Sequence, residues 1–292
     1  MSLHFVNLRK IWYLISILVI LPGLVSLAVR GLNLGIDFTG GSILEVRFDQ
    51  PVAVEKVREA AAALGLEASH GVQQSGATNY LLRTRHLTRE EGDRLLAELE
   101  KLGSYTVLRN ESVGPVIGRE LTYKAILALV IASVLMVIYI TIRFEFKQGI
   151  AAIIALIHDT LVVTGIFSLF RLEVDSAFIA AVLTIIGYSI NDTIIIFDRI
   201  RENMRSRARG ESLEDLVNRS LWQTLTRSVN TVLTVVFVLV AMYFLGGSTI
   251  RHFVLAMLIG VVSGAYSSIC NASPLWVDFK LLEKRGAPRT AP

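Results

Sequence analysis

The sequence predicts an α-helical polytopic membrane protein with six transmembrane helices and one small α+β domain outside the membrane. Of its 292 residues, 53% are hydrophobic and 18% are charged, against about 25% charged residues in soluble domains. Six apolar stretches are long enough to cross roughly 30 Å of hydrocarbon, and the segment between the first two has the composition of a soluble domain. This composition excludes a disordered chain and an ordinary cytosolic enzyme, and a single cysteine, Cys270, excludes a disulfide scaffold.

Each of the six predicted spans is an apolar stretch of helical length. They cover residues 11–29, 121–142, 149–170, 176–197, 220–245 and 253–277. The first follows Arg9 and Lys10 and ends in small residues, as a secretory signal peptide does, but it is longer than the roughly 7–15 apolar residues of such a signal. We therefore expect an uncleaved anchor.

The basic residues predict the orientation of these spans, because cytoplasmic loops carry an excess of Lys and Arg. On one side of a six-span weave lie Arg9, Lys10, Arg143, Lys147, Arg199, Arg201, Arg205, Arg207, Arg209, Arg219, Lys280, Lys284, Arg285 and Arg289. The short loops on the other side hold Arg171 and Arg251. Both termini are therefore expected in the cytoplasm and residues 31–120 in the periplasm.

The predicted domain plan follows from this weave. Residues 1–30 form the cytoplasmic N-terminus and first helix, 31–120 the periplasmic domain, 121–280 helices two to six, and 281–292 a basic cytoplasmic tail. The overall charge of +4 does not indicate nucleic-acid binding, because residues 31–120 hold 10 basic and 13 acidic residues. The positive excess lies beside the apolar stretches, where it encodes orientation.

The external segment predicts a β-α-β-β-α-β order, which is that of a ferredoxin-like split β-α-β fold. We expect a strand over 42–48, a helix over 52–64, one or two strands within 66–85, a helix over 86–102 and a strand over 104–109. Thr88 and Glu91 have the spacing of a capping box. No residue here indicates catalysis, and His70 and His86 lack the sequence partners of a metal site. A surface for another protein chain is the expected use.

Three glycines lie in residues 35–41, which read G-I-D-F-T-G-G. Their spacing does not fit a G-x-G-x-x-G phosphate loop, and no helix follows to hold a phosphate. We expect a structural turn that leads into the first strand.

Ionisable residues inside the apolar runs are the candidate functional residues, because a charge at the centre of a span costs roughly 2.5–3.5 kcal/mol. They are Asp159, Asp192 and Arg227. At about 1.5 Å per residue, Asp192 and Arg227 lie at the same depth on antiparallel spans, so the two can meet. The alternatives are a static ion pair and a proton relay, in which movement between the two groups loads or releases a proton.

Polar residues at the same level are expected to support such a relay: Ser189, Asn191, Thr193, Gln223, Thr226 and Asn230. His158 beside Asp159 is either a second relay element or a packing histidine. Asp198 is expected to cap or pair locally at the membrane edge, and residues 211–218 to form a short interfacial helix.

Several segments resemble the SecF family of bacterial protein-export membrane subunits, within the resistance–nodulation–division superfamily. They are residues 35–41, 113–121 (V-G-P-V-I-G-R-E-L), 157–165 (I-H-D-T-L-V-V-T-G), 186–203 (I-G-Y-S-I-N-D-T-I-I-I-F-D-R-I-R-E-N) and 224–234. Asp37, Gly40 and Gly41 belong to the first of these motifs. The small external domain favours SecF over the related SecD.

The resemblance implies that the chain pairs with SecD, associates with the SecYEG channel and extends to YajC and YidC as further partners. It implies that the pair uses the proton-motive force, with protons and no other cofactor, to draw unfolded preproteins across the bacterial inner membrane after SecA has acted. Asp192 and Arg227 match the residues that couple protons in that family. Trp222 departs from the family, where a small polar residue is expected.

Two other function classes are weighed against this one. A proton-coupled exporter of a small molecule or lipid belongs to the same superfamily, but six spans and one small domain are too little for it alone. An intramembrane aspartyl protease would use Asp159 and Asp192 as two membrane carboxylates. That enzyme class carries G-x-G-D, whereas Asp192 follows Ser-Ile-Asn, so no covalent catalysis is predicted.

Overall fold

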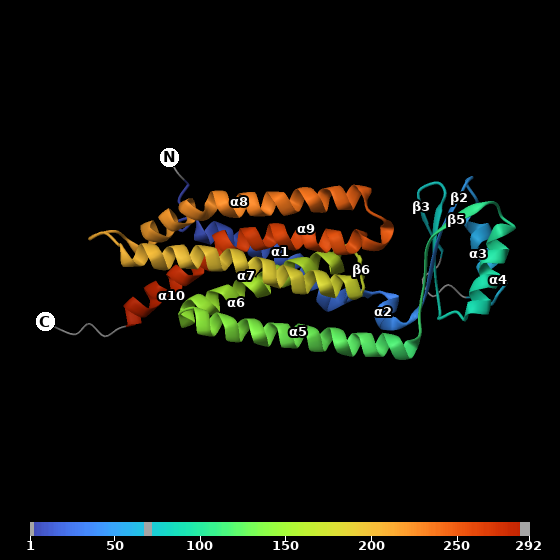
Figure 1. Ribbon diagram of the computed structural model, residues 1–292, viewed down its shortest axis with the longest axis horizontal. Coiled ribbons are helices and arrows are strands. Elements are labelled where there is room, and N and C mark those ends of the chain that lie inside the picture. The colour runs from blue at the N-terminus through green and yellow to red at the C-terminus, as the bar shows by residue number, and fades with distance from the viewer. Residues whose placement is uncertain (1–2, 67–71, 287–292) are drawn as a thin grey trace. The chain divides into compact units, whose positions relative to one another are not determined.

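A computed structural model describes residues 3–66 and 72–286, and these divide into two compact units (Figure 1). The helical unit contains Met1–Asn33 and Leu129–Pro292, and the sheet unit contains Leu34–Ala128. The expectations for His70 and for Arg289 in the C-terminal tail fall outside the described residues.

Six helices of the described chain are long and apolar enough to cross a membrane, which confirms the predicted spans. They are α1 (Arg9–Arg30), α5 (Pro115–Arg143), α6 (Phe146–Leu169), α7 (Ser176–Arg205), α8 (Leu213–Leu245) and a sixth span from Arg251 that consists of α9 (Arg251–Ser267), the π-helical η2 (Ser268–Ala272) and α10 (Ser273–Gly286). Short strands β1 (Asn33–Leu34) and β6 (Glu173–Val174) and the 3₁₀ turn η1 (Ser248–Ile250) connect them.

Helix α1 packs on α6 through small residues. Its buried residues are Ser16, Gly23 and Ser26, whereas Leu14 and Leu18 are exposed. A Cβ atom added to Gly23 would lie 2.6 Å from the Cα of Gly165 in α6, so the two backbones touch. Small residues allow such close approach between membrane helices, where packing replaces the hydrophobic effect.

The first helix and α10 meet at one end of the helical unit. Arg9 in α1 forms a 2.8 Å ion pair with Asp278 in α10, and the Tyr13 hydroxyl donates to the same carboxylate. Asp198 at the end of α7 pairs with Arg143 at 2.8 Å, which confirms the local pairing predicted for it. The start of α1 and the helix α10 therefore lie on the same side of the six spans.

The short interfacial helix predicted over 211–218 is wrong. Helix α8 begins at Leu213 and runs unbroken to Leu245. The Ser212 side chain caps it by accepting from the Asp215 amide at 3.0 Å. Leu216 and Val217 are fully buried in the helical core, so this first part of α8 packs on the protein.

The sheet unit has the predicted order of strands and helices after a short helix α2 (Ile36–Thr39). In chain order it contains β2 (Gly41–Phe48), α3 (Val54–Ala62), β3 (Val72–Ser75), β4 (Asn79–Thr84), α4 (Arg89–Glu100) and β5 (Tyr105–Val113). The strands lie in the order β3-β4-β2-β5, and each neighbouring pair is antiparallel. Figure 1 shows α3 and α4 side by side against the sheet, and Val46, Tyr80 and Leu99 are fully buried between them.

The glycine segment forms the predicted turn, and two of its glycines are required by geometry. Gly40 and Gly41 have φ values of 72° and 138°, which L side chains rarely adopt. A Cβ on Gly41 would lie 2.8 Å from the Thr84 carbonyl oxygen, and one on Gly40 would lie 3.1 Å from the Cα of Pro115. The turn therefore fits tightly between β4 and the start of α5.

The capping box predicted at the start of α4 is present. The Thr88 side chain accepts from the Glu91 amide, and the Glu91 carboxylate accepts from the Thr88 amide. Arg85 also donates to Glu91 at 2.6 Å. These bonds, the one from Arg85 first, lower the pKa of Glu91 from 4.5 to about 2.

A pH dependence follows from this shift. Because the folded-state pKa is depressed, ionised Glu91 contributes stability that is present above pH 4.5 and lost as the pH falls toward about 2. We expect an NMR titration of the Glu91 carboxyl to have its midpoint near 2, and Arg85→Gln to move it toward 4.5. Glu90→Gln, on the neighbouring exposed residue, should leave the midpoint in place. A midpoint near 4.5 in the unaltered chain would contradict the capping geometry.

Candidate functional site

Asp159, in the middle of α6, is a buried carboxylate surrounded by donors. Its side chain is 1% exposed. One oxygen accepts from Ser263 at 2.7 Å and lies 3.0 Å from Nδ1 of His158, and the other accepts from Ser189 at 2.6 Å and Ser267 at 2.7 Å. The donors come from α6, α7 and α9, so one side chain joins three helices.

Small residues on α9 make this arrangement possible. Gly260, Ser263, Gly264 and Ser267 recur at helical spacing and share one face of the helix. A Cβ on Gly264 would lie 3.0 Å from that of Ser189, and one on Gly260 would lie 2.2 Å from a side-chain carbon of α7. The glycines therefore bring α9 close enough to α7 for the serines to reach Asp159.

The carboxylate of Asp159 is saturated with hydrogen bonds. An ionised carboxylate accepts at about four lone-pair sites, and four donors occupy them. Because an ionised carboxylate only accepts, the ring nitrogen that faces it, Nδ1 of His158, carries a hydrogen, whereas Nε2 takes no part in this bond. That Nε2 is buried and has no hydrogen-bond partner among the described residues.

Polar contacts continue from this site toward α1. The His158 ring stacks on Tyr266, with ring centres 5.9 Å apart. The Tyr266 hydroxyl donates to the Trp12 carbonyl at 2.6 Å and lies 3.2 Å from the Ser16 hydroxyl, which accepts from Asn271 at 2.9 Å. Asn271 belongs to η2, a π-helical turn of a kind that often occurs at functional sites.

Asp192, in α7, has a different environment. It is 6% exposed, and one oxygen accepts from the Ser228 hydroxyl of α8 at 2.6 Å. The second oxygen is buried and has no hydrogen-bond partner within residues 3–66 and 72–286. A buried polar atom without a partner is costly and is found where a site takes a proton, a water or an ion. Asp192 therefore has one oxygen without a hydrogen-bond partner among the described residues, whereas both oxygens of Asp159 accept hydrogen bonds.

Arg227 does not pair with Asp192 within this chain. Its side chain is exposed, and no ion pair of the described residues joins the two. The predicted depth is correct, since the next residue, Ser228, binds Asp192. Successive helix residues differ by about 100° in direction, so Arg227 points away when Ser228 points inward. Among the described residues the printed partner of Asp192 is thus Ser228, and both the static ion pair and the proton relay stay predictions.

The predicted polar cluster divides into three groups. Ser189 and Thr193 face α9, where Ser189 binds Asp159 and Thr193 lies 2.8 Å from Ser268. Gln223 accepts from Arg199 at 2.7 Å and from Asn203 at 2.8 Å. The third group is exposed.

That third group forms an exposed polar patch on α7 and α8. Asn191, Thr226 and Asn230 are that group, and the patch also includes the exposed Arg227 and Thr231 of α8. The Tyr188 hydroxyl donates to the Thr231 carbonyl at 3.0 Å, which joins the two helices at this level. A charge that faced lipid here would cost roughly 2.5–3.5 kcal/mol, and charged residues within membrane spans usually face protein or water instead.

Sequence reasoning missed the serines that bind the two carboxylates: Ser228, Ser263 and Ser267. A serine in an apolar run carries little signal by itself. The spacing of Gly260, Ser263, Gly264 and Ser267 was a usable signal, because small residues at this spacing mark a close helix contact.

Comparisons with known proteins agree on one family. A model for the C-terminal region of the protein export membrane proteins SecD/SecF matches residues 94–282, and a model for the SecD/SecF GG motif matches residues 25–52. The protein translocase subunit SecF of Thermobaculum terrenum is 46% identical over 98% of this chain and 98% of its own length. The protein translocase subunit SecDF of Bacillus subtilis is 41% identical over 94% of this chain.

Solved structures extend the likeness to the fold. The crystal structure of SecDF from Thermus thermophilus, described as a translocon-associated membrane protein, matches with a TM-score of 0.87 at 36% identity over 96% of this chain. This chain covers 39% of that structure and 38% of the Bacillus subtilis relative. It therefore spans nearly all of a SecF relative and about two fifths of the SecDF relatives.

The different environments of the two aspartates predict different effects of the same substitution. Asp159→Asn replaces a carboxylate with a group that itself donates, so at least one of the four bonds is lost. Hydrogen bonds to charged groups contribute roughly 1.5–3 kcal/mol each, so we expect a destabilisation on the order of 2–4 kcal/mol. Asp192→Asn keeps an oxygen for Ser228 and should cost less than about 1 kcal/mol.

Thermal unfolding of the purified protein in detergent would measure both effects. Asp198→Asn, at an exposed ion pair, is the control for a lost surface charge. Equal unfolding temperatures for Asp159→Asn and Asp192→Asn would show that the four bonds at Asp159 do not hold the helices together.

Proposed function

We infer that this chain, which belongs to the SecD/SecF family of protein export membrane proteins, is the SecF-type subunit of a protein translocase. It is a multi-pass membrane protein by its six apolar helices and by its relatives. We propose that it works in the bacterial inner membrane with both termini in the cytoplasm and the sheet unit outside. The proposal continues the orientation that the basic residues predict.

SecD is the proposed cover of the exposed polar patch. The SecDF relatives join a region like this chain to a longer remainder in one polypeptide. A separate second membrane body would supply the same neighbour here. Arg227 and Asn230 are exposed within an apolar span, and a polar surface of a second helical body would satisfy both. SecYEG, YajC, YidC and the unfolded preprotein are the further proposed partners.

The observation that carries the proposed mechanism is the Asp192 oxygen that has no hydrogen-bond partner in the part of the chain that the structure describes. A proton that reaches this oxygen neutralises the carboxylate, while the other oxygen keeps its bond to Ser228. Loss of the proton restores a negative charge a short distance from Arg227, the residue beside Ser228. The protonated and the ionised state differ in the attraction between the Asp192 carboxyl group and Arg227. Proton passage can therefore move α7 and α8 relative to SecD, the proposed cover of the patch.

The proposed role of this movement is late preprotein export. Proton flow down its gradient would drive a cycle of helix positions, and the sheet unit would act on the emerging polypeptide. No covalent bond of the substrate is made or broken in this scheme, and protons are the sole cofactor that it needs. Asp159 would hold α6, α7 and α9 together during the cycle.

The test is preprotein translocation in sealed vesicles that carry SecD with this chain. Each sample is assayed with and without a proton gradient, after assembly with SecD has been shown to be equal. We expect Asp192→Asn to remove the gain that the gradient gives and to leave ATP-driven export unchanged. Asp198→Asn is the matched control and should keep the gain, because it alters an exposed ion pair at the end of the same helix.

Equal gains for the unaltered chain and Asp192→Asn would contradict the proposal. Asp192 would then be structural, and the proton path would run through Asp159 or the partner subunit. A growth difference that depends on a small toxic compound, with export unaffected, would instead support a small-molecule exporter.

A further inference from the structure

A short segment ahead of α1, residues 3–8, folds back onto the start of α8, and we call it the strap. The Phe5 amide donates to the side-chain oxygen of Asn218 at 2.9 Å, and the Trp222 indole donates to the Leu3 carbonyl at 2.9 Å. The residues of these two bonds lie 213 and 219 positions apart in the chain. The strap therefore joins the beginning of α1 to a helix that is distant in the sequence.

The contacts of the strap hold one side of α8. His4 lies 3.1 Å from the carboxylate of Asp215, which adds a third contact. Asp215, Asn218 and Trp222 are spaced by three and four residues, so they lie along one side of the helix. The strap is thus bound over about two turns of α8.

The strap is also anchored within the helical unit. Phe5 is 9% exposed and Val6 is fully buried, and both belong to the apolar core that contains Leu216 and Val217 of α8. The Trp12 indole of α1 donates to the Phe5 carbonyl at 3.0 Å. A rotation of α8 about its axis therefore acts against a segment that is fixed to α1.

Trp222 has no part in the site around Asp192, and the strap accounts for it. Its ring packs on Phe5, with ring centres 5.7 Å apart, in addition to the bond from its indole. The small polar residue that the family resemblance leads us to expect at this position would offer neither this ring nor an indole donor. Trp222 thus has a use in this chain, which is to hold the strap.

Arg227 lies on the side of α8 opposite the strap. It follows Asn218 by nine residues, which is about 2.5 helical turns. The next residue, Ser228, faces Asp192. A rotation of α8 by about 100° about its axis would therefore replace Ser228 by Arg227 in front of Asp192.

The bonds between the strap and α8 would not survive such a rotation. Side chains lie about 5 Å from the axis of a helix, so a rotation of about 100° moves them by about 9 Å. This movement is several times the length over which a hydrogen bond holds. Asn218 and Trp222 would both lose their strap partners.

We propose that the strap sets the rotation of α8: it holds the state in which Ser228 faces Asp192, and it leaves α8 when Arg227 turns toward the ionised carboxylate. Phe5 and Trp222 are then positioning residues, because they act on the site only through α8. This proposal rests on the proposed function, in which loss of a proton increases the attraction between Asp192 and Arg227.

The test locks the strap with a cross-link. His4→Cys with Asp215→Cys places two thiols where the two side chains meet, and a short bifunctional methanethiosulfonate joins them through bonds that a reducing agent cleaves. The cross-linked protein is assembled with SecD in sealed vesicles, and preprotein export is measured with and without a proton gradient. We expect the cross-link to remove the gain that the gradient gives and reduction to restore it, whereas export without the gradient stays unchanged.

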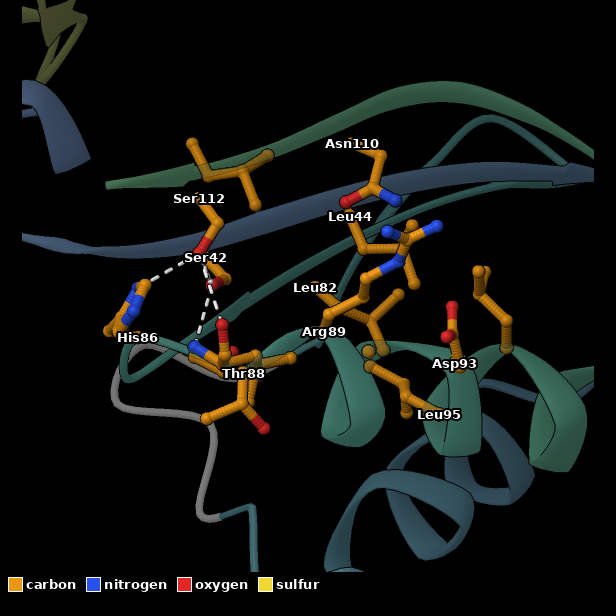
Figure 2. A pocket seen from close by; sticks show the side chains of 15 residues that line it. Ser42, Leu44, Leu82, His86, Thr88, Arg89, Asp93, Leu95, Asn110 and Ser112 are labelled. Carbon is orange, nitrogen blue, oxygen red and sulfur yellow. Dashed lines mark hydrogen bonds between the residues drawn. The ribbon is translucent and has the colours of Figure 1, made fainter. Parts of the chain in front are cut away.

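Two control pairs join elements that the proposal leaves in place. Lys147 of α6 and Glu283 of α10 form an ion pair within the helical unit. Ser42 and Ser112 line a cavity beside α4 in the sheet unit, on the paired strands β2 and β5, with their hydroxyls 2.7 Å apart (Figure 2). Cross-linked Lys147→Cys with Glu283→Cys, and Ser42→Cys with Ser112→Cys, should keep the gain. The unaltered chain, treated alike, should keep it too, because its one thiol, that of Cys270, is buried.

Hydrogen exchange tests the attachment of the strap without an export assay. Trp222→Phe keeps a ring on Phe5 but removes the indole that donates to the Leu3 carbonyl. With one bond lost, the strap should open more often, and the amides of residues 3–8 should exchange roughly threefold to tenfold faster in the complex with SecD. Tyr243→Phe, near the other end of α8, should leave their exchange unchanged.

A cross-linked strap that keeps the gain would overturn the proposal, as would a loss that reduction does not reverse or that either control pair shares. Equal exchange in Trp222→Phe and the unaltered chain would overturn it as well. A cross-link without effect, beside a lost gain in Asp192→Asn, contradicts the role of the strap alone. A gain that persists in Asp192→Asn contradicts the proposed function, and the exchange rates then still decide whether Trp222 holds the strap.

Discussion

A carboxylate placed in the middle of a membrane span has to be hydrogen-bonded on all sides by protein, and at Asp159 this requirement determines how α6, α7 and α9 pack. Ser189, Ser263 and Ser267 reach it only because glycines on α9 let the helices touch. The helix backbones approach each other just as closely at Gly23 and Gly165, where α1 packs on α6. Bonds to a buried carboxylate thus fix the geometry from which the rest of the helical unit is built.

Asp192 has fewer hydrogen bonds than Asp159, and we propose it as the group whose change of charge moves the helices. It has one bond to Ser228 and one oxygen without a partner among the described residues, and it lies beside an exposed polar patch that contains Arg227. A saturated carboxylate has no site for a proton without losing a bond, whereas an unsaturated one has. The proposed division between a structural Asp159 and a proton-carrying Asp192 rests on the number of donors around each.

The sequence predicted the features that depend on local pattern and missed those that depend on which helices are neighbours. Apolar length predicted six spans, the Thr88–Glu91 spacing predicted the cap, and the glycines at 40 and 41 predicted the turn. Counting residues from the membrane edge placed Asp192 and Arg227 at the same depth. It did not give the rotation of α8 about its axis, so it did not predict that Ser228 faces Asp192. Two of the partners of Asp159, Ser263 and Ser267, lie 104 and 108 residues away on α9. Their spacing with Gly260 and Gly264 indicates a close helix contact but does not identify Asp159 as the neighbour.

We expect Asp192 to be the carboxyl group that gains and loses a proton. Infrared difference spectroscopy of the complex with SecD, recorded as the pH outside the membrane is lowered, detects the C=O stretch of a newly protonated carboxyl group. We expect this C=O band to disappear in Asp192→Asn and to persist in Asp159→Asn. A band that persists in Asp192→Asn and disappears in Asp159→Asn would contradict it, and would make the saturated carboxylate the one that carries the proton.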